Sequence, residues 1–445
     1  MANKGSLFRL ALPMVVGQLA FASMSFIDTV LMGQLGVDYL AGGGLGAVAF
    51  QFFYISAVGV LAATANHIAF YKGRNQQESI HQSLLAGIVI VAILFCLFGL
   101  VIWNIKPIFL LFGQELAVSQ IAESYLQTLV WALFPALIFV LYRSLVLGLG
   151  KPALVLPISI IAALLNYPIS HTLMTGNFGF PEMGIQGVAL GTCIVSLGMA
   201  FSIILFSYRR PVFRAYPFWS GWSLFSWAEF VATWRLGIPI AVAHAMEIGL
   251  FSAASFLIGL VSVEALAAHQ VALQVTTLTF MIPLGISQAV SVRVGACYGA
   301  GDRAGVKQTV RKGLLAATIS ACIAGFVFIT FPETLTLFFI DDDAASVAAL
   351  LPVASSILFV AAMFQLVDGY QVVLMGALRG FKLGVAPTAA AIIAYWCIGF
   401  PLCYLLLEDF GAAGVWSAMG LGLGASALIL SAIYIRFHQN WQGAS

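Results

Sequence analysis

The sequence predicts an all-α integral membrane protein with twelve transmembrane helices in two pseudo-symmetric lobes of six helices each. Three observations lead to this fold class: the composition, the spacing of the apolar segments and an internal repeat. Apolar residues make up 62% of the 445 residues and charged residues only 8%, with a mean hydropathy of +1.03. A soluble domain carries roughly 25% charged residues, so most of the surface of this chain is expected to face lipid.

Apolar segments of about twenty residues or more alternate with short polar breaks along the chain, and each can cross a hydrocarbon core of roughly 30 Å. The first apolar run continues to about Met32, which is too long for the core of a signal peptide, so we take it as the first membrane helix. The predicted spans are residues 8–33, 40–70, 84–105, 122–147, 153–175, 185–208, 235–260, 266–298, 312–332, 348–377, 385–407 and 412–436.

An internal repeat divides the chain into two halves around its longest polar connection, at about 209–234. Pro13 in the first half corresponds to Pro239 in the second, 226 residues later. Further matches fall at the loops with the same offset, and the last of them is shifted by one residue. We therefore predict an N-terminal six-helix lobe at 1–215 and a C-terminal six-helix lobe at 216–445. Each half has an even number of spans, so the repeats are parallel, and transporters built in this way place the substrate path between the halves.

The distribution of basic residues predicts the orientation of the chain. With twelve spans, 18 of the 19 Lys and Arg residues fall on the side of the two termini, and only Lys106 falls on the other. Cytoplasmic loops carry such an excess of positive charge, so both termini are expected in the cytoplasm. The aspartate run at 341–343 is expected outside.

Several function classes are disfavoured by missing patterns. No basic patch with interleaved aromatic residues indicates a nucleic-acid partner, and none of the common hydrolase or metalloprotease motifs is present. The nucleotide-binding pattern G-x-x-x-x-G-K-[ST] is also missing, so we expect no enzyme activity, no cofactor, and transport driven by an ion gradient. The six cysteines lie in or beside apolar stretches without a C-x-x-C pair and are interpreted as small buried hydrophobic residues.

Three carboxylates within apolar segments are the strongest candidate functional residues: Asp28, Glu247 and Asp368. A charge at the centre of a membrane helix costs about 2.5–3.5 kcal/mol on insertion scales. A protonated acid in a structural hydrogen bond is the alternative interpretation. However, the repeat does not duplicate the acids, and a symmetric structural role would be expected to recur in both halves. The positions that the repeat relates to the three acids are Ala254, Phe21 and Tyr142.

Several stretches resemble the multidrug and toxic compound extrusion (MATE) family, in its NorM-like branch. They include FIDTVLMG at 26–33, LGIPIAVAHAMEIGLF at 236–251, ALAAHQVALQVTTLTF at 265–280, DGYQVVLMGALRG at 368–380 and YWCIGFPLCYLL at 395–406. The resemblance extends over nearly the whole chain. It implies two six-helix lobes around a central cavity in a bacterial cytoplasmic (inner) membrane. It also implies export of cationic amphiphilic drugs or dyes by alternating access, in exchange for Na⁺ or H⁺.

The resemblance assigns roles to residues of the N-terminal half. Asp28 matches the acid of the first helix, and Asn166, Ser170 and Thr192 match its partners. Ser170 departs from the family pattern, in which Asn is often found. Pro13 matches the proline at which the first helix bends.

In the C-terminal half, Glu247 and Asp368 match the acid pair typical of the NorM-like branch. Phe364, one helical turn before Asp368, stands where the family often has tyrosine, which removes one oxygen. Possible Na⁺ sites are therefore Asp28 with its partners, or the Glu247 and Asp368 pair. We favour Na⁺ because a hard cation prefers several oxygen ligands. H⁺ stays open because a buried carboxyl group alone can carry a proton.

The alternative function is a flippase of a lipid-linked or other amphiphilic substrate. Anionic diphosphate head groups would demand several Lys or Arg residues in the cavity, whereas the basic residues of this sequence are expected at the cytoplasmic ends of the helices. The expected partners are therefore small cationic drugs and the lipid bilayer, and the chain is expected to be monomeric.

Overall fold

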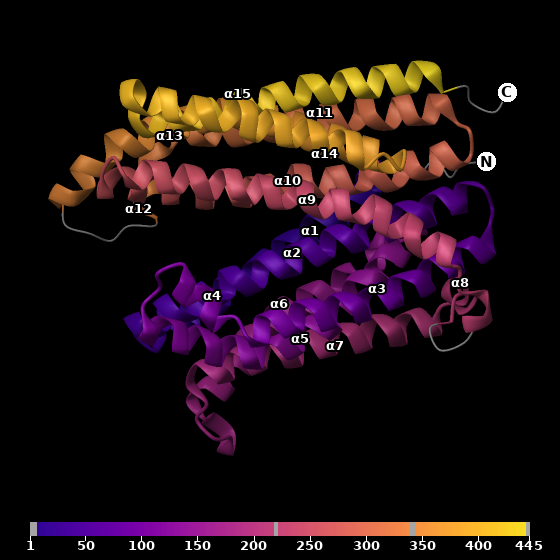
Figure 1. Ribbon diagram of the computed structural model, residues 1–445, viewed down its shortest axis with the longest axis horizontal. Helices are drawn as coiled ribbons and strands as arrows, with labels where there is room; N and C mark the ends of the chain where they lie inside the picture. Colours follow the sequence, from indigo (N-terminus) through magenta and orange to yellow (C-terminus); the bar gives the residue numbers. More distant parts are fainter. Residues whose placement is uncertain (1–6, 218–220, 339–343, 442–445) are drawn as a thin grey trace. The chain divides into compact units, whose positions relative to one another are not determined.

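The computed structural model describes residues 7–217, 221–338 and 344–441, and within these ranges every regular element is a helix (Figure 1). The aspartate run at 341–343 lies outside the described residues. The helices are α1 (Leu7–Gln34), α2 (Val37–Gly73), α3 (Gln77–Trp103), α4 (Lys106–Leu111), α5 (Leu116–Gly148), α6 (Leu156–Thr175), α7 (Gly184–Arg209), α8 (Pro211–Arg214), α9 (Trp227–Gly259), α10 (Val263–Gly299), α11 (Arg303–Thr330), α12 (Pro332–Leu337), α13 (Ala344–Gly380), α14 (Val385–Ile392) and α15 (Phe400–Asn440).

Eleven of the helical segments in the described residues are long and apolar enough to cross a membrane. The last of them, Val385–Asn440, has 56 residues and would be about 84 Å long as one straight helix. Gly411 interrupts it with the non-helical angles φ 55° and ψ −140°. The chain reverses direction there. This is shown by the thiol of Cys403, which lies 3.7 Å from the carbonyl oxygen of Val415 on the other side of Gly411. This segment therefore supplies two crossings, in agreement with the predicted twelve.

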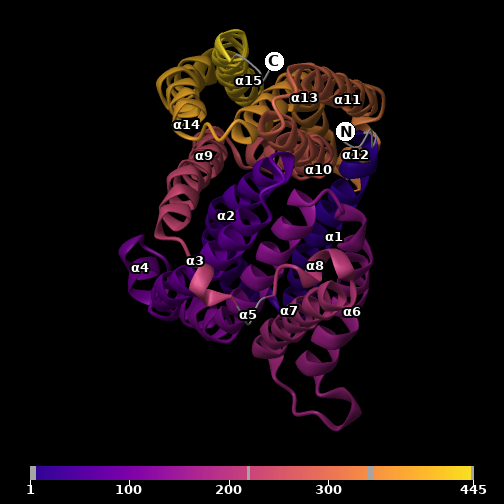
Figure 2. The same cartoon turned by 90° about the vertical axis from the view of Figure 1, so that its right-hand side faces the viewer.

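The π-helical stretch Ile393–Gly399 joins α14 to the first half of α15. α14 and α15 lie side by side in both ribbon views (Figures 1 and 2).

The internal repeat is present in the helix boundaries themselves. Both ends of α10 stand at the positions that the repeat relates to the ends of α2, and α12 corresponds to α4 in the same way. The packing recurs as well: α5 packs against α2, α3 and α7, while α13 packs against α10, α11 and α15. Two pseudo-symmetric sets of helices are therefore confirmed.

The chain forms two compact units, which we call the N-terminal unit (Val16–Ala241) and the C-terminal unit (Met1–Val15 with Val242–Ser445). The predicted lobe boundary at 215/216 precedes α9, whereas the contact boundary falls inside α9. The reason is local packing: Leu236 and Ile240 form a buried cluster with Ala63 of α2. The chain changes unit after Val15 and again after Ala241, and the repeat relates these two positions to each other.

Candidate functional site

The first predicted site forms at the meeting of α1, α6 and α7 in the N-terminal unit. The hydroxyl of Thr192 donates to Oδ2 of Asp28 at 2.8 Å, and Nδ2 of Asn166 donates to the same hydroxyl at 3.4 Å. Asp28, Asn166 and Ser170 are all buried. Asn166 and Ser170 are one turn apart on α6, so they lie on the same face of that helix.

Three oxygens of this cluster are buried without a hydrogen-bond partner: Oδ1 of Asp28, Oδ1 of Asn166 and Oγ of Ser170. Burying such a group unpaired costs about 1–3 kcal/mol, and more when it is charged. The cluster contains no Lys, Arg or His, so a bound cation or a proton would be needed to pair with these oxygens. Several neutral oxygens around one carboxylate are the ligands that a hard cation prefers.

The hydrogen-bond chain also fixes the orientation of the amide. When Asp28 is ionised it only accepts, so Thr192 must donate to it. The Thr192 hydroxyl can then only accept a hydrogen bond from Asn166, so the amide nitrogen Nδ2 of Asn166 must face it. The amide oxygen of Asn166 is thereby left free for a cation. The structure therefore brings together Asp28, Asn166 and Thr192, as predicted from the resemblance.

Ser170 joins the cluster through a close approach of two helices. A Cβ built on Gly191 would lie 2.6 Å from the Cα of Ser170, so only glycine fits at this point of α7. Gly191 directly precedes Thr192 in the chain, so Ser170 packs against α7 one residue before the hydrogen-bond partner of Asp28.

A cavity opens next to Asp28 within the N-terminal unit. Its empty volume is about 1040 Å³, including its open mouth. Phe21, Tyr54, Arg143 and Asp28 are among its lining residues. The position of Arg143 corrects the expectation that all basic residues lie at the ends of the helices: it is five residues before the end of α5, yet its side chain reaches this cavity.

The second predicted acid pair belongs to the C-terminal unit, on α9 and α13. Asp368 is buried, and its Oδ1 has no hydrogen-bond partner. Its charge interacts electrostatically with that of Glu247. Glu247 is partly exposed, and its Oε2 lies 3.8 Å from Nδ1 of His244, one helical turn earlier. The structure thus adds His244 to the predicted pair.

Phe364 fills an aromatic cluster one turn before Asp368. Its side chain is 3% exposed, and its ring packs edge-on against Phe251 and Trp416, with centroid distances of 6.0 and 5.4 Å. The indole N–H of Trp416 donates to Nδ1 of His269 at 3.0 Å. The other ring nitrogen of His269 lies 2.7 Å from the hydroxyl of Ser255. His269 therefore accepts at one nitrogen, as a neutral imidazole does, and it acts as a structural bridge.

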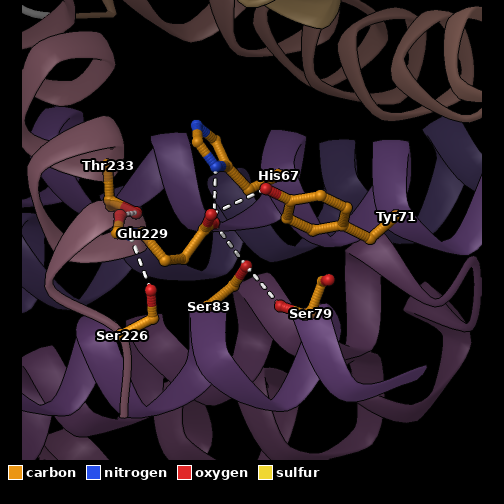
Figure 3. A network of polar contacts seen from close by, with 7 residues as sticks. All are labelled: His67, Tyr71, Ser79, Ser83, Ser226, Glu229 and Thr233. Carbon is orange, nitrogen blue, oxygen red and sulfur yellow. Dashed lines mark hydrogen bonds and ion pairs between the residues drawn. The ribbon is translucent and has the colours of Figure 1, made fainter. Parts of the chain in front are cut away.

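A polar network that was not predicted lies around Glu229 in the N-terminal unit (Figure 3). Its Oε1 is 2.6 Å from Nδ1 of His67 and accepts from the hydroxyl of Ser83 at 2.6 Å. Its Oε2 accepts from the Tyr71 hydroxyl at 2.7 Å. The network joins α2, α3 and the first turn of α9.

The sequence contains a signal for the position of Glu229. Ser226-x-x-Glu229 is a capping-box pattern that marks the start of a helix, and the amide of Glu229 donates to the Ser226 hydroxyl at 3.3 Å. The predicted start of this helix at residue 235 was therefore eight residues late. Thr233, which donates to the Glu229 carbonyl at 2.9 Å, continues the same turn.

Pro13 lies inside α1, and its repeat counterpart Pro239 lies inside α9. Proline removes a backbone donor and crowds the preceding turn, so both are points at which a helix bends easily. Each proline is two residues before the point at which the chain changes unit. The bend at Pro13 stays a prediction.

Comparison with known proteins identifies the family. The MatE family model matches residues 13–172 and 239–405, so its two segments begin at the repeat-related prolines. The probable multidrug resistance protein NorM of Pseudomonas putida is 37% identical over 428 residues, which cover 96% of this chain and 93% of that protein. Its namesake of Rhizobium meliloti is 35% identical, with coverages of 96% and 92%.

Solved structures share the fold. A mutant of the Vibrio cholerae MATE transporter VcmN superposes with a TM-score of 0.88 at 18% identity, covering 98% of this chain and 97% of that one. The eukaryotic MATE transporter AtDTX14 superposes with a TM-score of 0.86 at 19% identity, covering 96% and 94%. The chain therefore belongs to the multidrug and toxic compound extrusion family, in its NorM-like branch, and is a membrane transporter and not an enzyme.

Proposed function

We propose that this protein exports cationic amphiphilic drugs or dyes in exchange for Na⁺, by alternating access between two six-helix lobes at 1–215 and 216–445. The observation that carries the proposal is the group of three buried, unpaired oxygens on Asp28, Asn166 and Ser170. A hard cation prefers several oxygen ligands, as this set of residues offers, whereas a proton on Asp28 could pair with at most one neighbouring acceptor. The names of the curated relatives support drug export.

Coupling follows from the shared position of the ion cluster and the cavity. Asp28 belongs to the cluster and also lines the cavity. A cationic drug about 4 Å from this carboxylate would gain about 4 kcal/mol at an effective dielectric constant of about 20. Na⁺ bound to Asp28 cancels that attraction, so ion and drug weaken each other's binding reciprocally. Entry of Na⁺ would thus favour release of the drug.

The alternative flippase function receives less support from this cavity. Among the described residues that line it, Arg143 is the only Lys or Arg, and Asp28 opposes it with a negative charge. A diphosphate head group would meet one cation and one anion. A monomer is proposed as the working form.

The test uses purified protein in proteoliposomes loaded with a cationic dye. A Na⁺ gradient and a pH gradient are imposed one at a time, with K⁺ replacing Na⁺ in the control. We expect dye transport to follow the Na⁺ gradient and to be lost in Asp28→Asn. Transport that follows only the pH gradient would establish H⁺ coupling, and export of an anionic lipid in place of the dye would favour the flippase.

The orientation has its own experiment. We propose that both termini are cytoplasmic, as the charge distribution suggests. In a Cys-free background, a cysteine at Asp409 should react with an impermeant thiol reagent added to intact cells, and one at Arg303 should react only after lysis. The opposite labelling pattern would invert the proposed topology.

A further inference from the structure

The repeat relates α3 of the N-terminal unit to α11 of the C-terminal unit, but the two helices differ in charge. Both begin at repeat-related positions, Gln77 and Arg303. After Arg303, α11 has three further exposed basic residues, which we call its basic face: Lys307, Arg311 and Lys312. The residues that the repeat relates to them are buried on α3: His81, Leu85 and Ala86. The charges thus belong to one copy of a duplicated helix.

In the N-terminal unit, the connection to the second half of the chain covers this part of α3. Nε2 of His81 lies 3.0 Å from the carbonyl oxygen of Pro217, and the short turn Trp222–Leu224 also packs against α3. In the described part of the C-terminal unit, α11 packs chiefly against α10, α12 and α13, and its basic face stays exposed. α11 therefore presents outward a surface that its counterpart buries.

The basic face has no negative partner within the described part of the chain. None of the ion pairs found there includes one of its residues, and α11 itself contains no Asp or Glu. Asp302, just before the helix, accepts from the amide of Gly305 at 2.7 Å. Lys307 and Arg311 are one helical turn apart, where like charges repel each other. An anion on this surface would relieve the repulsion.

Beyond the basic face, the exposed side of α11 becomes apolar. Five large apolar side chains are exposed along it: Leu315, Ile319, Ile323, Phe326 and Ile329. From Gly313 to its end at Thr330 the helix is about 27 Å long, close to the hydrocarbon core of roughly 30 Å. With this apolar side in the core, Arg311 and Lys312 stand at the level of the lipid head groups.

We propose that the basic face of α11 binds the phosphodiester group of an anionic phospholipid, whose acyl chains lie along the apolar side of the same helix. Arginine can bind two phosphate oxygens at once through charge-assisted hydrogen bonds, and lysine adds a compact point charge. Each basic residue beside an anionic membrane surface strengthens binding about fivefold. The surface is specific to the C-terminal unit, because the corresponding side chains of α3 are buried.

The test uses the purified full-length protein in a neutral detergent and Na⁺-free buffer. Phosphatidylglycerol, which is anionic, is compared with phosphatidylcholine, which has the same acyl chains but no net charge. We expect phosphatidylglycerol to raise the unfolding temperature of the wild type, and phosphatidylcholine to have a much smaller effect. The double variant Lys307→Gln, Arg311→Gln should need about 25 times more phosphatidylglycerol for the same increase, because two basic contacts are lost.

Two further double variants separate lipid recognition from other effects. Lys307→Arg with Arg311→Lys keeps both charges and should retain most of the response. Arg74→Gln with Lys151→Gln removes two exposed charges from loops of the N-terminal unit and should respond like the wild type. An equal loss in both Gln double variants would show a general attraction of positive charge and would overturn the inference. An equal response to phosphatidylcholine, or to inorganic phosphate alone, would overturn it as well, and so would an unchanged response of Lys307→Gln, Arg311→Gln.

Discussion

Nδ1 of His67 and Oε1 of Glu229 lie 2.6 Å apart, although the two residues are separated by 162 positions in the sequence. Both side chains are buried, and the hydroxyls of Ser83 and Tyr71 complete the contacts of the carboxylate (Figure 3). The pair fastens the first turn of α9 to α2 and α3. It therefore places part of the helix that begins the second half of the chain inside the N-terminal unit.

Loss of Glu229 should destabilise this attachment strongly. Removing one partner of a buried pair leaves the others unsatisfied and costs about 3–5 kcal/mol. We expect Glu229→Ala to lower the thermal unfolding temperature in detergent markedly. The control is Glu123→Ala, which breaks the half-exposed pair with Lys106 at 3.3 Å, where a loss of about 0–1 kcal/mol is typical. Equal effects of the two substitutions would show that the network adds no stability.

The contact between α6 and α7 gives a steric test of the ion cluster. In Gly191→Ala the new methyl group would lie 2.6 Å from the Cα of Ser170, which forces the helices apart. Overpacking of this kind costs about 1–3 kcal/mol, and it should weaken Na⁺ binding to the Asp28 cluster. Gly198→Ala, on the same helix but with open space around it, is the matched control. If Na⁺ stabilised Gly191→Ala as much as the wild type, Ser170 would not be part of the Na⁺ site.

Binding of Na⁺ should itself be visible as stability. A ligand present at about 100 times its dissociation constant stabilises the folded state by about 2.7 kcal/mol. We expect NaCl, but not KCl, to raise the unfolding temperature of the wild type, and Asp28→Asn to lose most of this increment. Asp409→Asn, which changes an exposed acid, should retain it. If NaCl still stabilised Asp28→Asn, the Na⁺ site would instead be the one proposed in the C-terminal unit.

The acids of the C-terminal unit should matter for transport more than for folding. Glu247→Gln and Asp368→Asn keep the shape of each side chain and remove a charge from a buried or partly buried place, which costs little stability. We expect normal amounts of folded protein in the membrane and impaired efflux of cationic dye from cells. Wild-type efflux in both variants would show that this pair does not participate.

The sequence predicts the fold well because a lipid-facing chain repeats a simple pattern. Span length follows from local composition, and the correspondence of Pro13 with Pro239 follows from the internal repeat. The reversal at Gly411, between the last two predicted spans, agrees with the sequence because a short polar break precedes this residue. The start of α9 was misplaced, because the apolar pattern begins later than the capping signal at Ser226.

The site was predictable where the family resemblance supplied the partners, as for Asp28 and Thr192. The partnership of Glu229 with His67 depends on how two distant helices pack, and no periodicity reveals it. The same holds for Arg143: its place in the cavity depends on the rotation of α5 about its axis, which hydropathy does not determine.

The places at which the chain changes unit make each half of the sequence dependent on the other. Residues 1–15 belong to the unit built mainly from the second half, and residues up to Ala241 belong to the unit built mainly from the first. The contacts repeat in the same way: Val15 packs against Gly285, and their repeat counterparts Ala241 and Gly59 pack against each other. The two repeats thus exchange their leading segments, as the protomers of a domain-swapped dimer do. If the chain were cut between 215 and 226, His67 and its partner Glu229 would be on different fragments, and each fragment should need the other to fold.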